Sequence, residues 1–328
     1  ELDAAFEAGL APDIIIMGAE NIGSRAFAGQ IINLGTLGVT EASLMTAFGE
    51  ANTATVLWHG GVYGIPMRTE AIALIYNKDL VSNEYLPGNR FDFNDLKEKA
   101  QKFLVDKGKP LICNHGMGNF SEDAYHVAPI FFGFGVPAYI DNTGKAYANT
   151  VQAINAGTWI DIFHIYSYDE NDYGSCNDRL INEEVGMWWS GPWAISGLKS
   201  AGLNYGIVPM GKPFNGVQVH MITTAALARG NAYEALDLIQ TITNKENSIQ
   251  YVLIDSVVPA NQAALLDPAV QALPDIKAFG AAAQESVPFG NEPFHYCQWA
   301  PVGQAVQRIW TNIQTPTQAL NQAQQEIE

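Results

Sequence analysis

The sequence predicts an α/β protein made of two lobes. Short apolar segments of strand length alternate with amphipathic segments of helix length, which is typical of α/β lobes with mainly parallel sheets. The 328 residues exceed what one small core usually holds. No Pro- or Ser-rich linker separates the two halves, so we expect the chain to cross between the lobes more than once.

The first strand is expected near the start of the chain, after a helix-like piece from Glu1 to Ala8. Asp13 to Met17 reads DIIIM, a run that predicts a strand buried on both faces. Asp92, with Asp95 three residues later, predicts the start of a helix. A later helix is expected to bury an apolar face formed by Val151, Ile154, Ile162 and Ile165.

The second half shows two more strands and two capped helices. Val185 to Trp189 and Tyr205 to Val208 are the predicted strands. Asn231 is expected to begin a helix, with Glu234 at the capping-box position. The buried face of that helix is predicted to be Ala235, Leu238, Ile239 and Ile242. The last helix is predicted from Thr315 as cap, Pro316 in the first turn and Gln318 in the capping box.

One segment combines strand character with charge. Tyr63 to Leu80 reads YGIPMRTEAIALIYNKDL and has apolar stretches on both sides of Arg68-Thr69-Glu70. Burying Arg68 and Glu70 unpaired is costly, which makes a simple core strand a poor explanation. We therefore expect this strand to leave one lobe, cross a solvent-filled cleft and enter the other.

The charge balance excludes some partners. The chain carries 34 acidic and 17 basic residues, a formal charge of −17 at pH 7. Binding to nucleic acid or to an anionic membrane needs clustered Lys and Arg, so neither is expected. No apolar run approaches the roughly 20 residues that span a bilayer.

Motif spacing favours neither a metal centre nor a bound cofactor. Cys113, Cys176 and Cys297 are too widely spaced for a zinc or redox motif, although one disulfide is possible. The six histidines lack HxH and HExxH spacing, and the chain contains no GxGxxG, GxxxxGK[ST] or GxSxG motif. Asp169 to Asp178 partly matches a calcium loop but has Tyr173 at position 5, so we interpret it as an acidic surface loop.

Three aromatic residues are candidates for stacking on a ligand. Trp193 follows a predicted strand, Trp299 precedes a helix, and Tyr125 lies near a helix start. Large rigid rings suit the flat C–H faces of pyranose sugars, whose hydroxyls need carboxylates and amides around the rim. The alternative for each ring alone is an ordinary place in the core.

The polar candidates are mostly carboxylates. Adjacent acids such as Glu122 and Asp123 could form a catalytic pair, but adjacency does not place two carboxyls on opposite sides of a substrate. We expect one of the two to bond sugar hydroxyls and the other to interact with a helix N-terminus. The whole polar set is Glu20, Asn21, Arg68, Glu70, Glu122 and Asp123.

Five motifs, in order, resemble one family. They are APDIIIM at Ala11, the Tyr63–Leu80 segment, EEVGMWWSGPWAI at Glu183, VPANQAAL at Val258, and the terminal helix pair. Together they resemble the extracellular solute-binding proteins of family 1, the maltodextrin and sugar binders of ATP-binding cassette (ABC) importers. The resemblance implies a type II periplasmic-binding-protein fold, with two α/β lobes joined by hinge strands.

The resemblance also implies a function. It implies a bacterial extracytoplasmic protein, periplasmic or lipid-anchored, that binds an oligosaccharide or disaccharide, delivers it to a membrane permease and catalyses nothing. A monomer without cofactor or metal is expected. The implied ligand-binding residues are Trp193, Trp299, Tyr125, Glu70, Arg68, Glu20, Asn21, Met17 and Asp123.

Two departures from the family pattern affect these expectations. Met17, Glu20 and Asn21 stand where maltodextrin binders carry a Trp and an Asp-Arg pair, which disfavours a maltodextrin ligand. Only Glu1 to Ala8 precedes the first strand, so about 40 to 50 residues of the family's strand-helix-strand start are expected to be missing. The first lobe would then be incomplete, with an exposed sheet edge.

The points at which the chain is expected to pass between the lobes define the lobe boundaries. The first lobe is expected to contain 1–67 and 222–272, and the second 71–219 and 275–328. Hinges are predicted near 68–70, 220–221 and 273–274.

Two other functions stay open at this stage. The same fold could bind a polyamine, which suits the acidic balance, or a glycerol phosphate, for which Arg68 is the obvious cation. A carbohydrate-active enzyme would need two opposed carboxylates about 5 to 9.5 Å apart.

Overall fold

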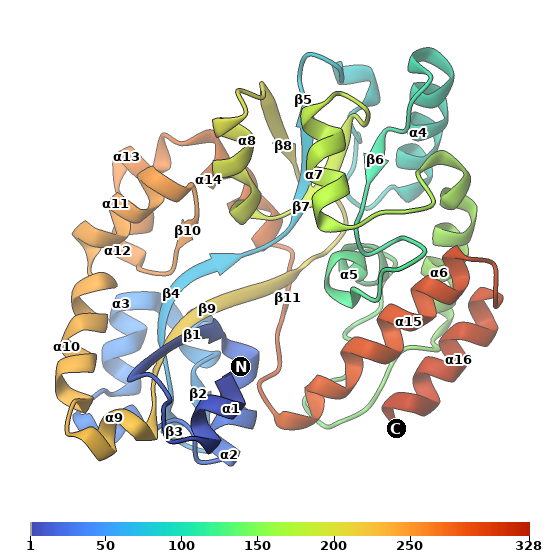
Figure 1. Ribbon diagram of the computed structural model, residues 1–328. Coiled ribbons are helices and arrows are strands. Elements are labelled where there is room, and N and C mark those ends of the chain that lie inside the picture. The colour runs from blue at the N-terminus through green and yellow to red at the C-terminus, as the bar shows by residue number, and fades with distance from the viewer. Residues whose placement is uncertain (1) are drawn as a thin grey trace. The chain divides into compact units, whose positions relative to one another are not determined.

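The computed structural model describes residues 2–328 and divides them into two compact units (Figure 1). The first unit comprises 2–70, 215–276 and 288–295, and the second comprises 71–214, 277–287 and 296–328. Residues 215–219, 275–276 and 288–295 thus cluster with the first unit, whereas the predicted second lobe includes them. The predicted hinges stay a prediction.

An antiparallel sheet forms the centre of the first unit. Its strand order is β1 (Ile14–Gly18), β9 (Phe214–Ile222), β4 (Ile65–Glu70) and β10 (Val258–Pro259), and a fifth strand, β11 (Val287–Pro288), also pairs with β9. Ile15 of β1 and Val217, Val219 and Met221 of β9 lie in the hydrophobic core of this unit. Gly18 and Arg68 both pair with Gln218, so β9 connects the ends of β1 and β4.

The second unit has a sheet of its own. Its order is β6 (Ile112–Cys113), β7 (Met187–Ser190), β5 (Ala73–Asn77) and β8 (Tyr205–Val208). The central strand, β5, is fully buried at Ala73, Leu74 and Ile75, as expected for an apolar strand covered on both faces. The helices α15 (Trp299–Trp310) and α16 (Pro316–Ile327), red in Figure 1, pack against each other and against α6 (Val151–Phe163).

The prediction of mainly parallel sheets is wrong. Of the strand pairs in the two orders given above, β6 with β7 is parallel and the others are antiparallel. An apolar run indicates that both faces of a strand are covered. It does not indicate whether the neighbouring strand runs parallel or antiparallel to it. The expectation that both faces of Asp13–Met17 are buried is also wrong, because β1 lies at a sheet edge and Ile16 is 54% exposed.

Two predicted helix starts are confirmed. Asp92 caps α4 (Phe93–Lys107) by accepting the Asp95 N–H, and Thr315 and Gln318 form the capping box of α16. Asn231 precedes α10 (Ala232–Ile242), but its side chain makes no cap bond there and instead donates to Asp13. A tertiary partner has replaced the local one.

Two predicted buried faces are only partly correct. In and after α6, Val151, Ile162 and Ile165 are exposed, while Trp159, Ile160 and Phe163 are buried. In α10, Leu238 and Ile242 are exposed, while Ala235, Leu236 and Ile239 are buried. Each helix carries more apolar residues than its buried face holds. Residue spacing alone therefore did not identify which of them are buried.

The remaining elements complete the two units. Those within the first unit are α1 (Leu2–Glu7), η1 (Ala19–Asn21), α2 (Ile22–Phe27), η2 (Leu34–Leu37), α3 (Glu41–Ala54), β2 (Leu57–Trp58), β3 (Gly61–Val62), α9 (Thr224–Arg229), α11 (Lys245–Asp255), α12 (Gln262–Leu265) and α13 (Pro268–Gln271). Those within the second are η3 (Asn83–Tyr85), α5 (Ala124–Gly133), η4 (His164–Tyr166), α7 (Tyr173–Ile181), η5 (Pro192–Ala194) and α8 (Ile195–Ser200). At the unit boundaries lie α14 (Pro274–Ala283), β11 (Val287–Pro288) and η6 (Pro293–Gln298).

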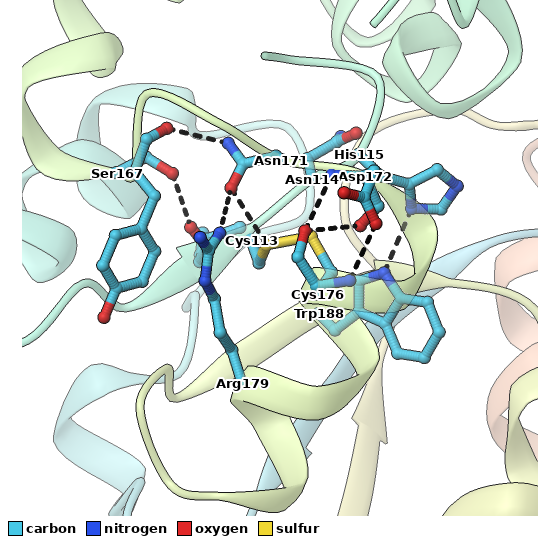
Figure 2. The surroundings of a disulfide bond; sticks show 12 residues. Cys113, Asn114, His115, Ser167, Asn171, Asp172, Cys176, Arg179 and Trp188 are labelled. Atoms are coloured by element: carbon cyan, nitrogen blue, oxygen red, sulfur yellow. Dashed lines mark hydrogen bonds between the residues drawn. A yellow bond between two sulfur atoms is a disulfide. The ribbon is translucent and has the colours of Figure 1, made fainter. Parts of the chain in front are cut away.

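A disulfide joins β6 to α7 in the second unit. Cys113 and Cys176 form this bond, and Cys297 is a free, exposed cysteine. Figure 2 shows Asn171 beside the disulfide, where its amide donates to Tyr168 O and its oxygen accepts from Arg179. Asp172 caps α7 in a capping box with Ser175. Asn171 and Asp172 of the segment that partly matches a calcium loop therefore form hydrogen bonds that stabilise α7 and the turn before it.

None of the helices formed by residues 2–328 combines the length and apolar character that crossing a bilayer requires.

Candidate functional site

Four aromatic rings from distant parts of the chain gather in the second unit. Tyr125 lies parallel to Phe214 at 6.2 Å between ring centroids, and Trp299 lies 5.7 Å from Phe214. Trp193 lies 6.2 Å from Tyr125. Phe214 is buried, whereas Tyr125, Trp193 and Trp299 are half-buried. We call these four residues the aromatic wall.

Two glycines allow the wall to form. A Cβ atom on Gly191 would lie 2.2 Å from the Trp193 ring, so only glycine permits this ring position at the end of β7. A Cβ atom on Gly303 would lie 2.0 Å from the backbone oxygen of Glu122. The close approach at Gly303 lets α15, which begins at Trp299, pack beside the segment that leads to Tyr125.

Tyr125 is held at the first turn of α5. Asp123 caps this helix, and its Oδ1 accepts the backbone N–H groups of Tyr125 and His126. The Tyr139 hydroxyl donates to Ala124 O, which fixes the same turn from the other side. Hydrogen bonds from the Asp123 cap and from Tyr139 therefore fix the helix turn that carries Tyr125.

A cluster of two histidines and one aspartate lies next to the wall. His126 Nδ1 is 2.6 Å and His115 Nε2 is 3.6 Å from Asp123 Oδ2. The His126 ring also stands perpendicular to Trp193, 5.9 Å between centroids. Both carboxylate oxygens of Asp123 thus have partners within the second unit.

The charges in this cluster follow from burial and contact. Burial, reinforced by the nearby His126, lowers the pKa of His115 to about 3. Burial alone would raise the pKa of Asp123, but the hydrogen bond from His126 and the two imidazoles outweigh it and hold that pKa at about 2. Near neutral pH the cluster therefore contains an ionised Asp123 and an uncharged His115.

This trio has metal-ligand residue types but not a metal-binding hydrogen-bond pattern. The three side chains are the only such group found among residues 2–328. The Trp188 indole N–H, which is only a donor, donates to His115 Nδ1 at 3.1 Å, so the His115 hydrogen sits on Nε2. A histidine that binds metal through Nε2 carries its hydrogen on Nδ1 and donates it to an acceptor. The trio therefore fits a structural support for Asp123 rather than a metal centre.

A second polar cluster lies in the first unit. Arg68 Nε donates to Glu70 Oε1 at 2.6 Å, and Gln218 donates to Glu70 Oε2 at 3.3 Å. A second Arg68 nitrogen donates to the Tyr251 hydroxyl. We call these residues, with Glu20 and Asn21, the acidic cluster. Its members come from β4, β9, α11 and η1.

Glu20 completes this cluster with a second carboxylate. A Cβ atom on Gly18 would lie 2.2 Å from both Glu20 carboxylate oxygens, so the carboxylate is folded over that glycine. Asn21 Nδ2 donates to Glu20 Oε1 at 3.2 Å and to Gly18 O. Burial, together with the repulsion from Glu70, raises the pKa of Glu20.

The predicted site residues therefore separate into groups. Tyr125, Trp193 and Trp299 form the wall with Phe214, and Glu20, Asn21, Arg68 and Glu70 form the acidic cluster. Asp123 caps α5, the helix that carries Tyr125, and Met17 packs against the core of the first unit. Whether any of them binds a ligand stays a prediction.

Sequence reasoning missed Phe214, Gln218, Tyr251, His115 and His126. Phe214 and Gln218 sit four positions apart in the strand FNGVQVHMI, so the alternation of side chains along a strand could have assigned both to one face. Nothing local distinguishes Tyr251 or the two histidines, because their partners are far away in sequence.

The sequence profile of the family described as "Bacterial extracellular solute-binding protein" matches residues 1–278. The chain belongs to this family. The type II periplasmic-binding fold and an extracytoplasmic location follow from that membership. The disulfide agrees with the location, because disulfides persist in oxidising compartments.

Relatives of this solute-binding protein include two sugar binders. It is 26% identical to the maltotriose-binding protein of Pyrococcus abyssi (strain GE5 / Orsay) over 322 residues, 94% of this chain and 68% of the relative. It is 25% identical to the galactooligosaccharide-binding protein of Bacillus subtilis (strain 168), over 96% of this chain and 76% of the relative. Both relatives are named as binding proteins.

Solved structures share the fold. The Thermus thermophilus maltotriose binding protein bound with maltotriose superimposes with a TM-score of 0.84 at 22% identity, covering 99% of this chain and 87% of that chain. The predicted family and fold are thereby confirmed.

Proposed function

We propose that this solute-binding protein captures an oligosaccharide for an ABC importer and does not change it chemically. The aromatic wall carries the proposal. Half-buried Tyr125 and Trp299 lie against the buried ring of Phe214, and half-buried Trp193 lies beside Tyr125. Rings that are held rigid and left partly uncovered offer flat apolar faces at low entropic cost, which suits stacking on pyranose rings.

The acidic cluster supports the same ligand class. Sugar hydroxyls are hydrogen-bond donors, and carboxylates are the strongest acceptors available among side chains. Glu20 and Glu70 supply these acceptors, with amides from Asn21 and Gln218 beside them. The names of the two relatives, which specify maltotriose and galactooligosaccharide, agree with a sugar ligand.

The proposal includes a permease of an ABC importer as partner and the hinges predicted from the sequence. A sugar that contacts the closed conformation more extensively than the open one would shift the population towards closure. We propose that transport, rather than catalysis, uses this shift.

Titration with neutral malto- and galacto-oligosaccharides tests the proposal. Calorimetry should detect binding of at least one class, and the melting temperature should rise with the concentration of that sugar. Trp193→Ala should lower the affinity at least about tenfold while shifting the melting temperature little, because the ring is half-buried. Trp58→Ala, which truncates another half-buried tryptophan outside the wall, is the matched control and should retain the affinity.

Two results would contradict the proposal. Equal loss of affinity in the Trp193 and Trp58 variants would remove the wall from the binding site. Products released from any of these sugars on prolonged incubation would indicate an enzyme instead.

A further inference from the structure

The single cation of the acidic cluster already has partners. Arg68 Nε donates to Glu70 Oε1, and Nη1 donates to the Tyr251 hydroxyl. A guanidinium recognises phosphate or carboxylate through two parallel N–H groups, either Nε with Nη2 or Nη1 with Nη2. Each of these pairs has one nitrogen engaged within the first unit. Arg68 therefore offers an anionic ligand no fork in which both nitrogens are unengaged.

The carboxylates outnumber this cation. Glu70 is fixed from both sides, by Arg68 on Oε1 and by Gln218 on Oε2, and only 10% of its side chain is exposed. The Glu20 carboxylate folds over Gly18, whose strand partner Gln218 donates to Glu70, so the two carboxylates lie in one cluster. Among residues 2–328 no cation contacts Glu20. A negative group on a ligand would meet two carboxylates and one engaged guanidinium.

We propose that Arg68 is a positioning residue for Glu70, and that the Glu20–Glu70 pair makes the protein select neutral, hydroxyl-bearing ligands against anionic ones. Sugar phosphates and uronic acids would be rejected, because unfavourable contacts against a competitor contribute to specificity as directly as favourable ones. This inference rests on the proposed function and names the ligand charge that the site accepts.

Matched ligands test the selectivity. Each neutral malto- or galacto-oligosaccharide is compared by calorimetry at pH 7 with the same sugar oxidised at C6 to the carboxylate. The oxidised member should bind at least about tenfold more weakly, since like charges in an interface oppose association. Glu20→Gln, which removes one charge at constant size, should reduce this ratio, and Tyr251→Phe should strengthen binding of the oxidised sugar by releasing Nη1.

A double-mutant cycle tests the positioning role. Arg68→Met and Glu70→Gln should each weaken binding of the neutral sugar, and the double variant should bind about as well as Glu70→Gln alone. Additive losses would show that Arg68 contacts the ligand directly. Melting temperatures of all variants separate misfolding from lost affinity. If the Arg68 variant unfolds, the Tyr251 variant, which keeps the Arg68–Glu70 ion pair, can still be measured.

The outcomes distinguish this inference from the proposed function. Equal binding of neutral and oxidised sugars overturns the inference but leaves sugar binding in place. Preferred binding of the oxidised sugar overturns it more strongly. If the wild-type protein binds neither member of any pair, the proposed function fails and the inference fails with it.

Discussion

The ring of Trp193 occupies the space that a Cβ atom on Gly191 would need, with Cζ3 at 2.2 Å from that position. Real Cβ atoms do not approach another atom so closely, so the position of this ring depends on the absence of a side chain two residues earlier. The relationship connects a backbone feature of the β7–η5 turn with the proposed stacking surface.

Replacing Gly191 by alanine is therefore expected to displace Trp193. The affinity for the bound oligosaccharide should fall at least about tenfold, because the stacking face moves. Trp fluorescence titration and melting curves measure both effects. The control is Gly197→Ala in α8, where a Cβ atom would meet nothing within 4 Å. A Gly191 variant with unchanged affinity would show that the ring position is not needed for binding.

Gly303→Ala should destabilise the second unit. The new methyl group would meet the Glu122 carbonyl oxygen, which belongs to the backbone and cannot rotate away. Overpacking of this kind typically costs about 1 to 3 kcal/mol, measurable by denaturant unfolding. Gly280→Ala, a glycine of α14 with no atom within 4 Å of the added Cβ, should not destabilise the protein. Equal stabilities for the two variants would contradict the close approach.

Removing the disulfide should cost more than removing the free cysteine. Cys113 and Cys176 are 63 residues apart, and loop closure of that length corresponds to about 4 kcal/mol in the chain-entropy treatment. A Cys113→Ser/Cys176→Ser double variant should lose stability of this order in urea unfolding. Cys297→Ser should change the stability by less than about 0.5 kcal/mol, because Cys297 is exposed. A double variant as stable as the wild type would rule out this contribution.

His220 should make the protein less stable in acid. Burial lowers its pKa from 6.5 to about 4, and its Nδ1 has no partner in the structure of residues 2–328. Between these two values the unfolded chain binds a proton that the folded protein excludes, so stability falls as the pH drops from about 6.5 to 4, by about 3 kcal/mol in total.

The variant His220→Leu removes this titration. Its stability should depend less on pH over that window than the stability of the wild type, and urea unfolding at several pH values measures the difference. Measurements at pH 8, where neither state is protonated at His220, provide the reference. Parallel pH curves for the two proteins would show that His220 does not contribute.

Local sequence signals predicted local structure well. Asp92 and Thr315 cap helices as expected, because each cap is a contact between residues three positions apart. Such a contact forms whatever the rest of the chain does. The signal failed at Asn231, whose side chain bonds to Asp13, 218 residues away.

The candidate site was predictable only in part. Tyr125, Trp193 and Trp299 were predicted from the sequence as stacking residues. Phe214, which lies between Tyr125 and Trp299, was not identified, because a buried phenylalanine in a strand resembles any other core residue. The sequence did not show that Asp123, a predicted ligand contact, also caps a helix start and lies beside two imidazoles.

The sequence by itself determined the α/β class, the caps of α4 and α16, the charged strand Arg68-Thr69-Glu70 and the family. These features depend on neighbouring residues or on motifs in a fixed order. Tertiary structure decided the antiparallel pairing, the contacts of Arg68 with Glu70 and Tyr251, and the glycines that seat Trp193 and α15. These features join segments that lie far apart in the chain, and their energies arise only when folding brings those segments into contact.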